Sequence, residues 1–394
     1  MNKNLKEINQ ALKNQSPIPY LLNNGYKIDE IKGQIIDDLT PFFEDKNSLE
    51  ENSLLYLVSD WINLSMIKIK FHGIEHDIKL VIENYKQAKE TNFPILTKAM
   101  QDLFPDYIQA GNKYWSILHL ELNKSTLEIE EFIHASFKDL LDIIEGLMKT
   151  FIIEIVIVNR IIRGKPISVN EIKNLKLGNL IDELINNSPL STLFTTKPDN
   201  IKFSDWRNIA AHQNYSTLQN GKIECKYGTP NNRRVFTISR EELFDRVSQC
   251  SRTLEVLNIC HKFFGFDNYD KLKLEISSEV KSAGRNEMWY LMFASSAISQ
   301  GFEVQELEFD EKVSKFVMLD LIEENPLKRG IHATLFIYNL WCMTNSAKIV
   351  MNYKKKDGQI FLSAECEEQV FWEIAKGNQP IDYLAEKMKL SIIS

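Results

Sequence analysis

One segment of the chain, residues 151–162, reads FIIEIVIVNRII and is apolar on almost every side of a helix. In the preceding residues 129–148, apolar side chains recur every three or four positions. Together these segments predict one long helix that ends near Gly164 and Pro166. Because a helix that is apolar all round must be buried, the sequence predicts a helical bundle around residues 151–162.

The composition favours the same fold class. Glycine and proline contribute only 15 and 11 of the 394 residues, while 44% of residues are hydrophobic and 26% are charged, which is typical of a compact, helix-rich protein. Glu154, Asn159 and Arg160 interrupt even the most apolar segment, so we expect no membrane-spanning helix and no membrane partner. The polar first residues, MNKNLKEINQ, do not resemble a signal peptide.

The five cysteines also indicate a cytoplasmic protein. Their number is odd and no C-x-x-C pair occurs, so we expect reduced and mostly buried thiols rather than disulfides or a metal cluster. These cysteines are Cys225, Cys250, Cys260, Cys342 and Cys366.

Breaks in the periodicity predict a mainly α protein of three regions. Residues 1–120 form an N-terminal helical region of unknown role, residues 121–266 a central bundle, and residues 267–394 a C-terminal α+β region suited to sensing or oligomerisation. Capping-box patterns, S-x-x-E, mark three helix starts at Ser125, Ser168 and Ser239. In the C-terminal region, residues 302–309 and 348–363 indicate strands.

A β-hairpin is expected within the central bundle. Residues 222–227 and 233–238 are short strand-like runs, and the five residues 228–232 between them would form the loop. The hairpin therefore precedes the helix that begins after Ser239.

Arginine is concentrated near this hairpin. The net charge is −7, yet six of the ten arginines lie between residues 207 and 252. A guanidinium group presents a planar fork of donors that suits phosphate oxygens. We interpret the concentration as a substrate-holding surface, with Arg233, Arg234 and Arg240 as phosphate contacts; a solvated helix face with a hairpin rim is the alternative.

The segment DWRNIAAHQNY at residues 205–215 gathers ionisable, amide and phenolic groups at a predicted helix start. Ser204 or Asp205 would be the N-cap. Asn208, His212 and Tyr215 would then share a helix face at i, i+4 and i+7. Arg207 would lie near the positive end of the helix dipole, where a phosphate group binds well.

Arg207-Asn208, followed by three residues and His212, resembles the R-N-x-x-x-H form of the signature of HEPN domains. Residues 177–181, LGNLI, also resemble the segment that precedes this motif in the family. The resemblance covers residues 123–265 and implies a helical bundle with a long core helix before the motif.

The resemblance implies a metal-independent endoribonuclease that acts as a toxin or antiphage-defence effector in the cytoplasm. Arg207, Asn208 and His212 would be catalytic, and no cofactor would be needed. Beside the motif, and not from the resemblance, we expect Tyr215, Arg233, Arg234 and Arg240 to contact the substrate. Two motifs would line one cleft of a homodimer, with RNA as substrate and an antitoxin or sensor protein as a further partner. The alternative is an inactive HEPN scaffold that binds RNA, nucleotide or a protein.

A second pattern, His72-Gly73-Ile74-Glu75-His76, fits the H-x-x-E-H zinc motif of inverzincin peptidases. Glu154 is a distant candidate for a third ligand. Gly73 weakens the helix that must align both imidazoles, so we interpret the pattern as a polar helix face and expect no metal site. We likewise expect His119, His134, His261 and His332 to be isolated packed or surface residues.

Overall fold

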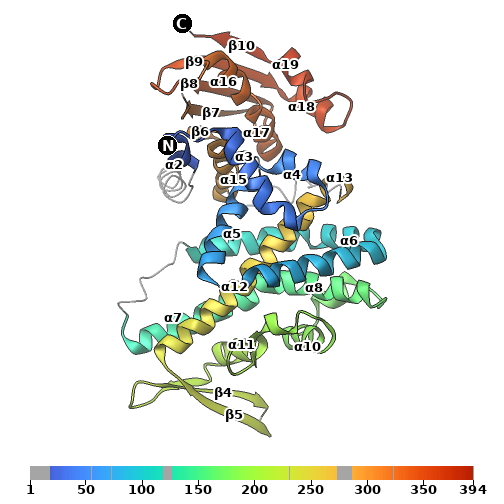
Figure 1. Cartoon of the computed structure of the whole chain (residues 1–394), viewed down its shortest axis with the longest axis vertical. Helices are drawn as coiled ribbons and strands as arrows, with labels where there is room; N and C mark the ends of the chain where they lie inside the picture. Colours follow the sequence, from blue (N-terminus) through green and yellow to red (C-terminus); the bar gives the residue numbers. More distant parts are fainter. Residues whose placement is uncertain are drawn as a thin grey trace. The chain divides into compact units, whose positions relative to one another are not determined.

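The computed structural model describes residues 18–54, 56–71, 73–118, 127–229, 231–272, 286–322 and 324–393. The fold is mainly α, with 63% helix and 16% strand (Figure 1). The chain divides into two compact units. The bundle unit comprises the described residues of Phe42–Asp45 and Leu64–Gly284; the sheet unit comprises those of Met1–Pro41, Lys46–Asn63 and Arg285–Ser394.

The long helix expected around residues 129–162 is present as three consecutive segments. These are α7 (Ile129–Leu141), the π-helix η3 (Asp142–Met148) and α8 (Lys149–Ile162). Ten of the fourteen side chains of α8 are buried, as its apolar surface requires. The N-cap of α7 is Glu128, and Ser125 of the expected capping box lies outside the described residues.

Helix α8 packs against α6 (Ile74–Leu118), which is a hairpin of two helices that meet at Asn92. The backbone of Asn92 is not helical (φ −161°, ψ 82°), and its side chain accepts a hydrogen bond from the N–H of Ile95. Tyr85, in the first half of α6, stacks on Phe264, and Tyr107, in the second half, contacts His261. Phe264 and His261 are only one turn apart on another helix of the bundle. The two halves of α6 therefore lie side by side, and the reversal occurs where Pro94 predicts a break.

The helix that both tyrosines contact is α12 (Arg240–Asp267), which completes the core of the bundle. Its capping box is confirmed: Ser239 accepts from the N–H of Glu242, and Glu242 accepts from the N–H of Ser239. Ser168 likewise caps α9. The shorter elements of this unit are α9 (Val169–Lys173), α10 (Leu177–Asn187), η4 (Ser191–Phe194), β1 (Thr195–Thr196), β2 (Ile201–Lys202), α11 (Phe203–Ala211), β3 (Tyr215–Thr217), β4 (Ile223–Thr229), β5 (Asn232–Ile238) and α13 (Tyr269–Leu272).

The expected hairpin is formed by β4 and β5, and β3 adds a third antiparallel strand. The five-residue loop is wrong, however, because pairing continues to Thr229 and Asn232 and leaves only two residues at the tip. Gly228, with φ +96°, permits this extension, since a Cβ there would meet the backbone oxygen of Asn232. Figure 1 shows the hairpin extending from the bundle beyond α11.

The sheet unit contains a five-stranded sheet of order β10-β9-β8-β7-β6. Neighbouring strands are antiparallel except β7 and β8, which are parallel and are joined through α16 (Pro326–Ala333) and α17 (Phe336–Thr344). Both C-terminal strand expectations are thereby confirmed. The strands are β6 (Phe302–Glu308), β7 (Val313–Asp320), β8 (Lys348–Lys354), β9 (Ile360–Glu367) and β10 (Lys389–Ile392).

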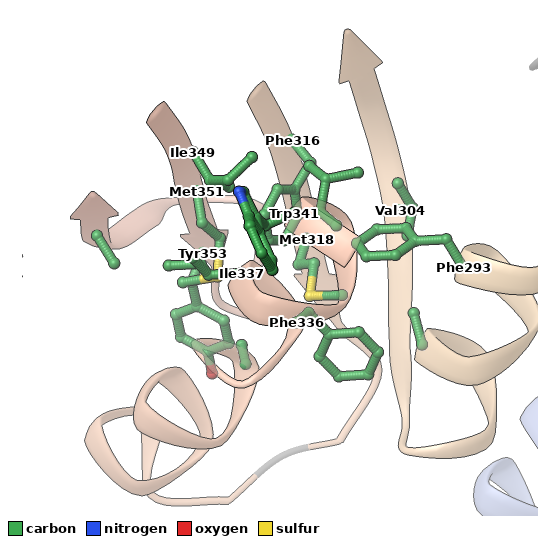
Figure 2. Packing of buried hydrophobic residues seen from close by; sticks show 14 of the residues in the cluster. Phe293, Val304, Phe316, Met318, Phe336, Ile337, Trp341, Ile349, Met351 and Tyr353 are labelled. Carbon is green, nitrogen blue, oxygen red and sulfur yellow. The ribbon is translucent and has the colours of Figure 1, made fainter. Parts of the chain in front are cut away.

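Helix α17 covers one face of this sheet. Figure 2 shows Phe336, Ile337 and Trp341 of α17 packed against inward-facing side chains of the strands, among them Phe316 and Met351. The remaining helices are α2 (Ile18–Asn23), α3 (Ile28–Leu39), η1 (Thr40–Phe42), α4 (Lys46–Asn52), α5 (Val58–Lys70), α15 (Asn286–Ser299), α18 (Glu368–Ala375) and α19 (Tyr383–Lys387).

A buried ion pair fixes the crossover between β7 and β8. Arg329 of α16 binds the carboxylate of Asp320 at 2.9 Å and donates to the backbone oxygens of Gln300 and Gly301. The hydroxyl of Tyr353 donates to the same carboxylate at 2.7 Å. Since every one of these groups has a partner, the network holds the helix on the sheet.

These two units differ from the three regions expected at residues 1–120, 121–266 and 267–394. From Leu64 onward, the first region belongs to the bundle unit, because both halves of α6 are needed to bury α8 and α12. The earliest helices belong instead with the C-terminal sheet: α2 contacts α15, and the hydroxyl of Ser299 donates to the carbonyl of Leu54. Sequence periodicity detects helices but not which distant helix each one packs against.

Candidate functional site

The candidate motif lies on α11, a nine-residue helix anchored by its apolar residues. Trp206 is fully buried, and its indole N–H donates to the hydroxyl of Thr196 at 2.8 Å. Phe203 and Ile209 are also buried. The helix begins at Phe203 after Lys202, so the expectation of an N-cap at Ser204 or Asp205 is wrong.

The motif histidine lies at the carboxyl end of this helix. His212 is the C-cap, is exposed, and its backbone N–H donates to the carbonyl of Asn208 at 3.1 Å. Gln213 then adopts a left-handed conformation (φ 49°), which turns the chain into β3. Tyr215 therefore lies on a strand and stacks on Phe137 at 4.1 Å, so the expected shared helix face of Asn208, His212 and Tyr215 is wrong.

Arg207 is held by an acidic residue that is not among the expected site residues. Its guanidinium donates two hydrogen bonds to Glu145, Nε to Oε2 at 2.7 Å and Nη2 to Oε1 at 2.9 Å. A third donor, Nη1, reaches the amide oxygen of Asn208 at 3.1 Å. The fork geometry therefore fixes Arg207 and Asn208 as one unit in the middle of α11.

This pairing shifts the pKa of both groups. The hydrogen bonds from Arg207 lower the pKa of Glu145, and the bonded carboxylate raises the pKa of Arg207. Glu145 lies on the π-helix η3, 62 positions before its partner. A π-turn displaces side chains from the α-helical register and is frequent at functional sites. The available sequence signal was Gly146, a helix-weakening residue inside a strongly helical pattern.

Most of the concentrated arginines are engaged inside the bundle. Arg240 donates to the carbonyl of Leu127 at 3.1 Å and lies 4.2 Å from the ring centroid of Phe132. Arg246 is 3% exposed and binds Asp199 and Asp245, whereas Arg252 binds Asp77. These side chains join elements of the bundle and do not form a continuous exposed cationic surface.

Arg233 and Arg234 are the exposed members of the group. They are consecutive residues of β5, so they point to opposite faces of the hairpin. Arg234 pairs in register with Tyr227 and lies 6.0 Å from its ring. Arg234 also acts electrostatically on Asp205, whose pKa is nevertheless raised, mainly by burial. Of the two arginines, Arg234 is thus the one directed toward α11.

The structure does not assemble the candidate zinc site among the residues it describes. Helix α6 begins at Ile74, and His72 lies outside the described residues. The carboxylate of Glu75 is engaged by Lys79 at 3.0 Å and Lys68 at 3.5 Å, which lowers its pKa. Across the described ranges, no three histidine, cysteine or acidic residues gather as metal ligands.

Glu154 has a different environment from that of a distant zinc ligand. It is 1% exposed, accepts a hydrogen bond from Tyr107, and its two oxygens lie 3.1 Å from Nδ1 of His261. His261 is therefore a packed residue, as expected, but it is not isolated, because it pairs with Glu154. Burial, followed by the charge of Glu154, raises the pKa of Tyr107 and Tyr85. Their hydroxyls stay protonated in the bundle core.

The cysteines are free, and four of the five are buried, with Cys342 half-buried. Burial raises the pKa of Cys225 to about 12 and that of Cys366 to about 11. Both thiols are thus protonated and unreactive near neutral pH.

Comparison with known proteins gives no match to a family model, to a curated protein or to a solved structure. None of the helices in the described residues is both long and apolar enough to cross a membrane.

Proposed function

We propose that the protein is a nucleic-acid-cleaving enzyme of the HEPN type, in which Arg207, Asn208 and His212 form the reaction site. More specifically, we propose a metal-independent endoribonuclease that acts as a toxin or antiphage-defence effector. The observation that carries the proposal is the arrangement on α11: Glu145 holds Arg207, Arg207 holds Asn208, and the histidine one turn after Asn208 is exposed. The resemblance of R-N-x-x-x-H to the HEPN signature supports the reaction class.

The reaction would be an internal transesterification of RNA. A base removes the proton of a ribose 2′-hydroxyl, whose oxygen attacks the adjacent phosphorus. The bond to the 5′-oxygen then breaks, and this leaving oxygen receives a proton from an acid. Histidine suits either role near neutral pH, and a guanidinium group stabilises the added negative charge on phosphorus. The products would be a 2′,3′-cyclic phosphate and a free 5′-hydroxyl.

The test compares wild type with His212→Ala on a labelled RNA, in the presence and absence of a chelator. Because the exposed His134 lies on α7 outside the motif, His134→Ala is a matched control. We expect cleavage by wild type and the control, at least a 100-fold loss in His212→Ala, as is typical for removal of a general acid–base, and no effect of chelator. Equal rates for wild type and His212→Ala would contradict the proposal.

An inactive HEPN scaffold is the second candidate. The observation that favours it is the engagement of Arg207 by Glu145, together with the internal partners of Arg240, Arg246 and Arg252, which leave little exposed arginine to hold a polyanion. Under this alternative, wild type and His212→Ala bind the same ligand and neither cleaves RNA.

A further inference from the structure

A lysine of α6 lies against the π-helix that carries Glu145. The side chain of Lys113 crosses Gly146, and a Cβ at position 146 would lie only 2.6 Å from its Cε. The glycine is therefore required for this path of the lysine side chain. At its end, the ammonium group lies 3.7 Å from the carboxylate of Asp142, and the side chain is 45% exposed.

The ion pair of Lys113 is loose compared with that of Arg207. Its separation of 3.7 Å exceeds the roughly 2.7–2.9 Å of a charge-assisted hydrogen bond. The guanidinium of Arg207, by contrast, makes two short bonds to Glu145. A phosphate group would therefore compete with Asp142 for the ammonium of Lys113 more effectively than with Glu145 for the guanidinium of Arg207.

A second lysine adds positive charge beside the same π-helix. Lys149 is the first residue of α8, and no ion pair joins it to any residue within the described ranges. Lys149 and Lys113 both act electrostatically on the carboxylate of Glu145. Since Glu145 already binds Arg207, the two lysines add positive charge next to the motif, and Asp142 opposes part of the charge of Lys113.

We propose that Lys113, with Lys149 beside it, binds a phosphate group of the RNA at or next to the scissile phosphodiester. This inference rests on the proposed function, and it names how the site neutralises its substrate. An ammonium group on a flexible stem is a point charge with three donors, so it can turn from Asp142 to phosphate while its stem stays packed over Gly146. Lys113 takes no proton from the substrate and forms no covalent bond to it.

The test measures binding of a 2′-O-methyl oligoribonucleotide, which cannot be cleaved, at several salt concentrations. Lys113→Met removes the charge and retains an unbranched stem over Gly146. We expect the slope of log affinity against log salt to decrease by about 0.7, the value for one phosphate contact on a single strand. Lys113→Arg should retain the slope. Lys98→Met is the control, because Lys98 lies on the same half of α6 and pairs with Asp102.

Cleavage of the corresponding all-ribose RNA separates this inference from the proposed function. We expect Lys113→Met to cleave at least tenfold more slowly than wild type and than Lys98→Met under single-turnover conditions. If wild type binds and cleaves and Lys113→Met retains both its salt slope and its rate, the role of Lys113 is refuted and the proposed function stands. If wild type neither binds nor cleaves RNA, both are refuted. Thermal unfolding of each variant checks that the fold is intact.

Discussion

At the scale of single residues, the arginines of this chain mainly join elements of the bundle. Each guanidinium inside the bundle reaches a carboxylate or a carbonyl on another element, which its rigid fork of donors favours over the flexible ammonium of lysine. Arg160 follows the same rule, with two bonds to Glu183 of α10. The concentration of arginine at residues 207–252 therefore did not correspond to a continuous exposed cationic surface. The pairs in question are Arg207–Glu145, Arg240–Leu127, Arg246–Asp199 and Arg252–Asp77.

The pair of Arg207 and Glu145 predicts a specific dependence of stability on pH. Arg207 lowers the pKa of Glu145 from its ordinary value of 4.5 in the folded protein. The pair therefore stabilises the folded state fully above pH 4.5, and this stabilisation is lost as the pH falls through the lowered pKa of Glu145 in the folded protein. We expect wild type to lose more stability than Glu145→Gln on acidification, by about 1 kcal/mol or less because both groups are partly exposed.

Denaturant unfolding of wild type and Glu145→Gln, at several pH values above and below 4.5, measures the difference in their free energies of unfolding. Glu131→Gln on the exposed side of α7 is the control, since it alters charge equally without touching Arg207. If wild type and Glu145→Gln lose the same free energy of unfolding between neutral pH and a pH below the pKa of Glu145, the pair does not stabilise the fold.

At the scale of elements, the π-helix and the extended hairpin shape the candidate site. The π-helix η3 interrupts an otherwise continuous helix and places Glu145 beside α11, while Gly146 makes room for Lys113. The hairpin places Arg233 and Arg234 on opposite faces of a ribbon whose base packs on α11, where Phe236 contacts Trp206 edge to face at 5.6 Å. These elements bring residues from three distant stretches of the sequence close to α11.

The hairpin arginines give an element-scale prediction. Replacing both Arg233 and Arg234 with alanine should weaken RNA binding and lower its salt slope by about 0.7 for each phosphate group that the variant no longer binds. The fold should survive, because both side chains are exposed. A matched control replaces Lys355 and Lys356, which are adjacent basic residues near the turn between β8 and β9. Unchanged affinity and slope in the arginine variant would place the RNA path elsewhere on the protein.

At the scale of the whole molecule, the proposed reaction requires more than one motif. Attack by the 2′-oxygen needs a base, and departure of the 5′-oxygen needs an acid, yet each chain supplies one histidine in the motif. We therefore propose that the active unit is a homodimer in which two copies of Arg207, Asn208 and His212 line one cleft. Each chain would then be inactive alone.

Mixing wild type with His212→Ala tests the shared site. If both histidines are required, activity should fall with the square of the wild-type fraction once subunits have exchanged, because mixed dimers are inactive. A linear fall, or full activity in a preparation that is monomeric by sedimentation, would show that one chain suffices. Mixing with His134→Ala controls for the mixing procedure and should leave the rate unchanged.

Much of the local structure could be predicted from the sequence. The apolar surface of residues 151–162 requires burial in a bundle, the Ser239 capping box starts α12, and the hairpin and the C-terminal strands follow from their residue patterns. These features depend on neighbours within a few positions, whose spacing the sequence states directly. The extent of the hairpin and the end of α11 did not follow, because each depends on a residue with positive φ, Gly228 or Gln213.

Which distant residues meet depends on how the helices pack. No pattern in the chain relates Glu145 to Arg207, Lys113 to Gly146, or Glu154 to His261, since each pair is brought together by helices that pack across the bundle. The same reason explains the division into units, in which both halves of α6 join the bundle and the first helices join the C-terminal sheet. Local residue patterns were enough to predict most of the helices and strands and the faces that they bury. The partner of each charged side chain was settled by packing, because burial in a shared core, rather than position in the chain, selects the neighbours of each residue.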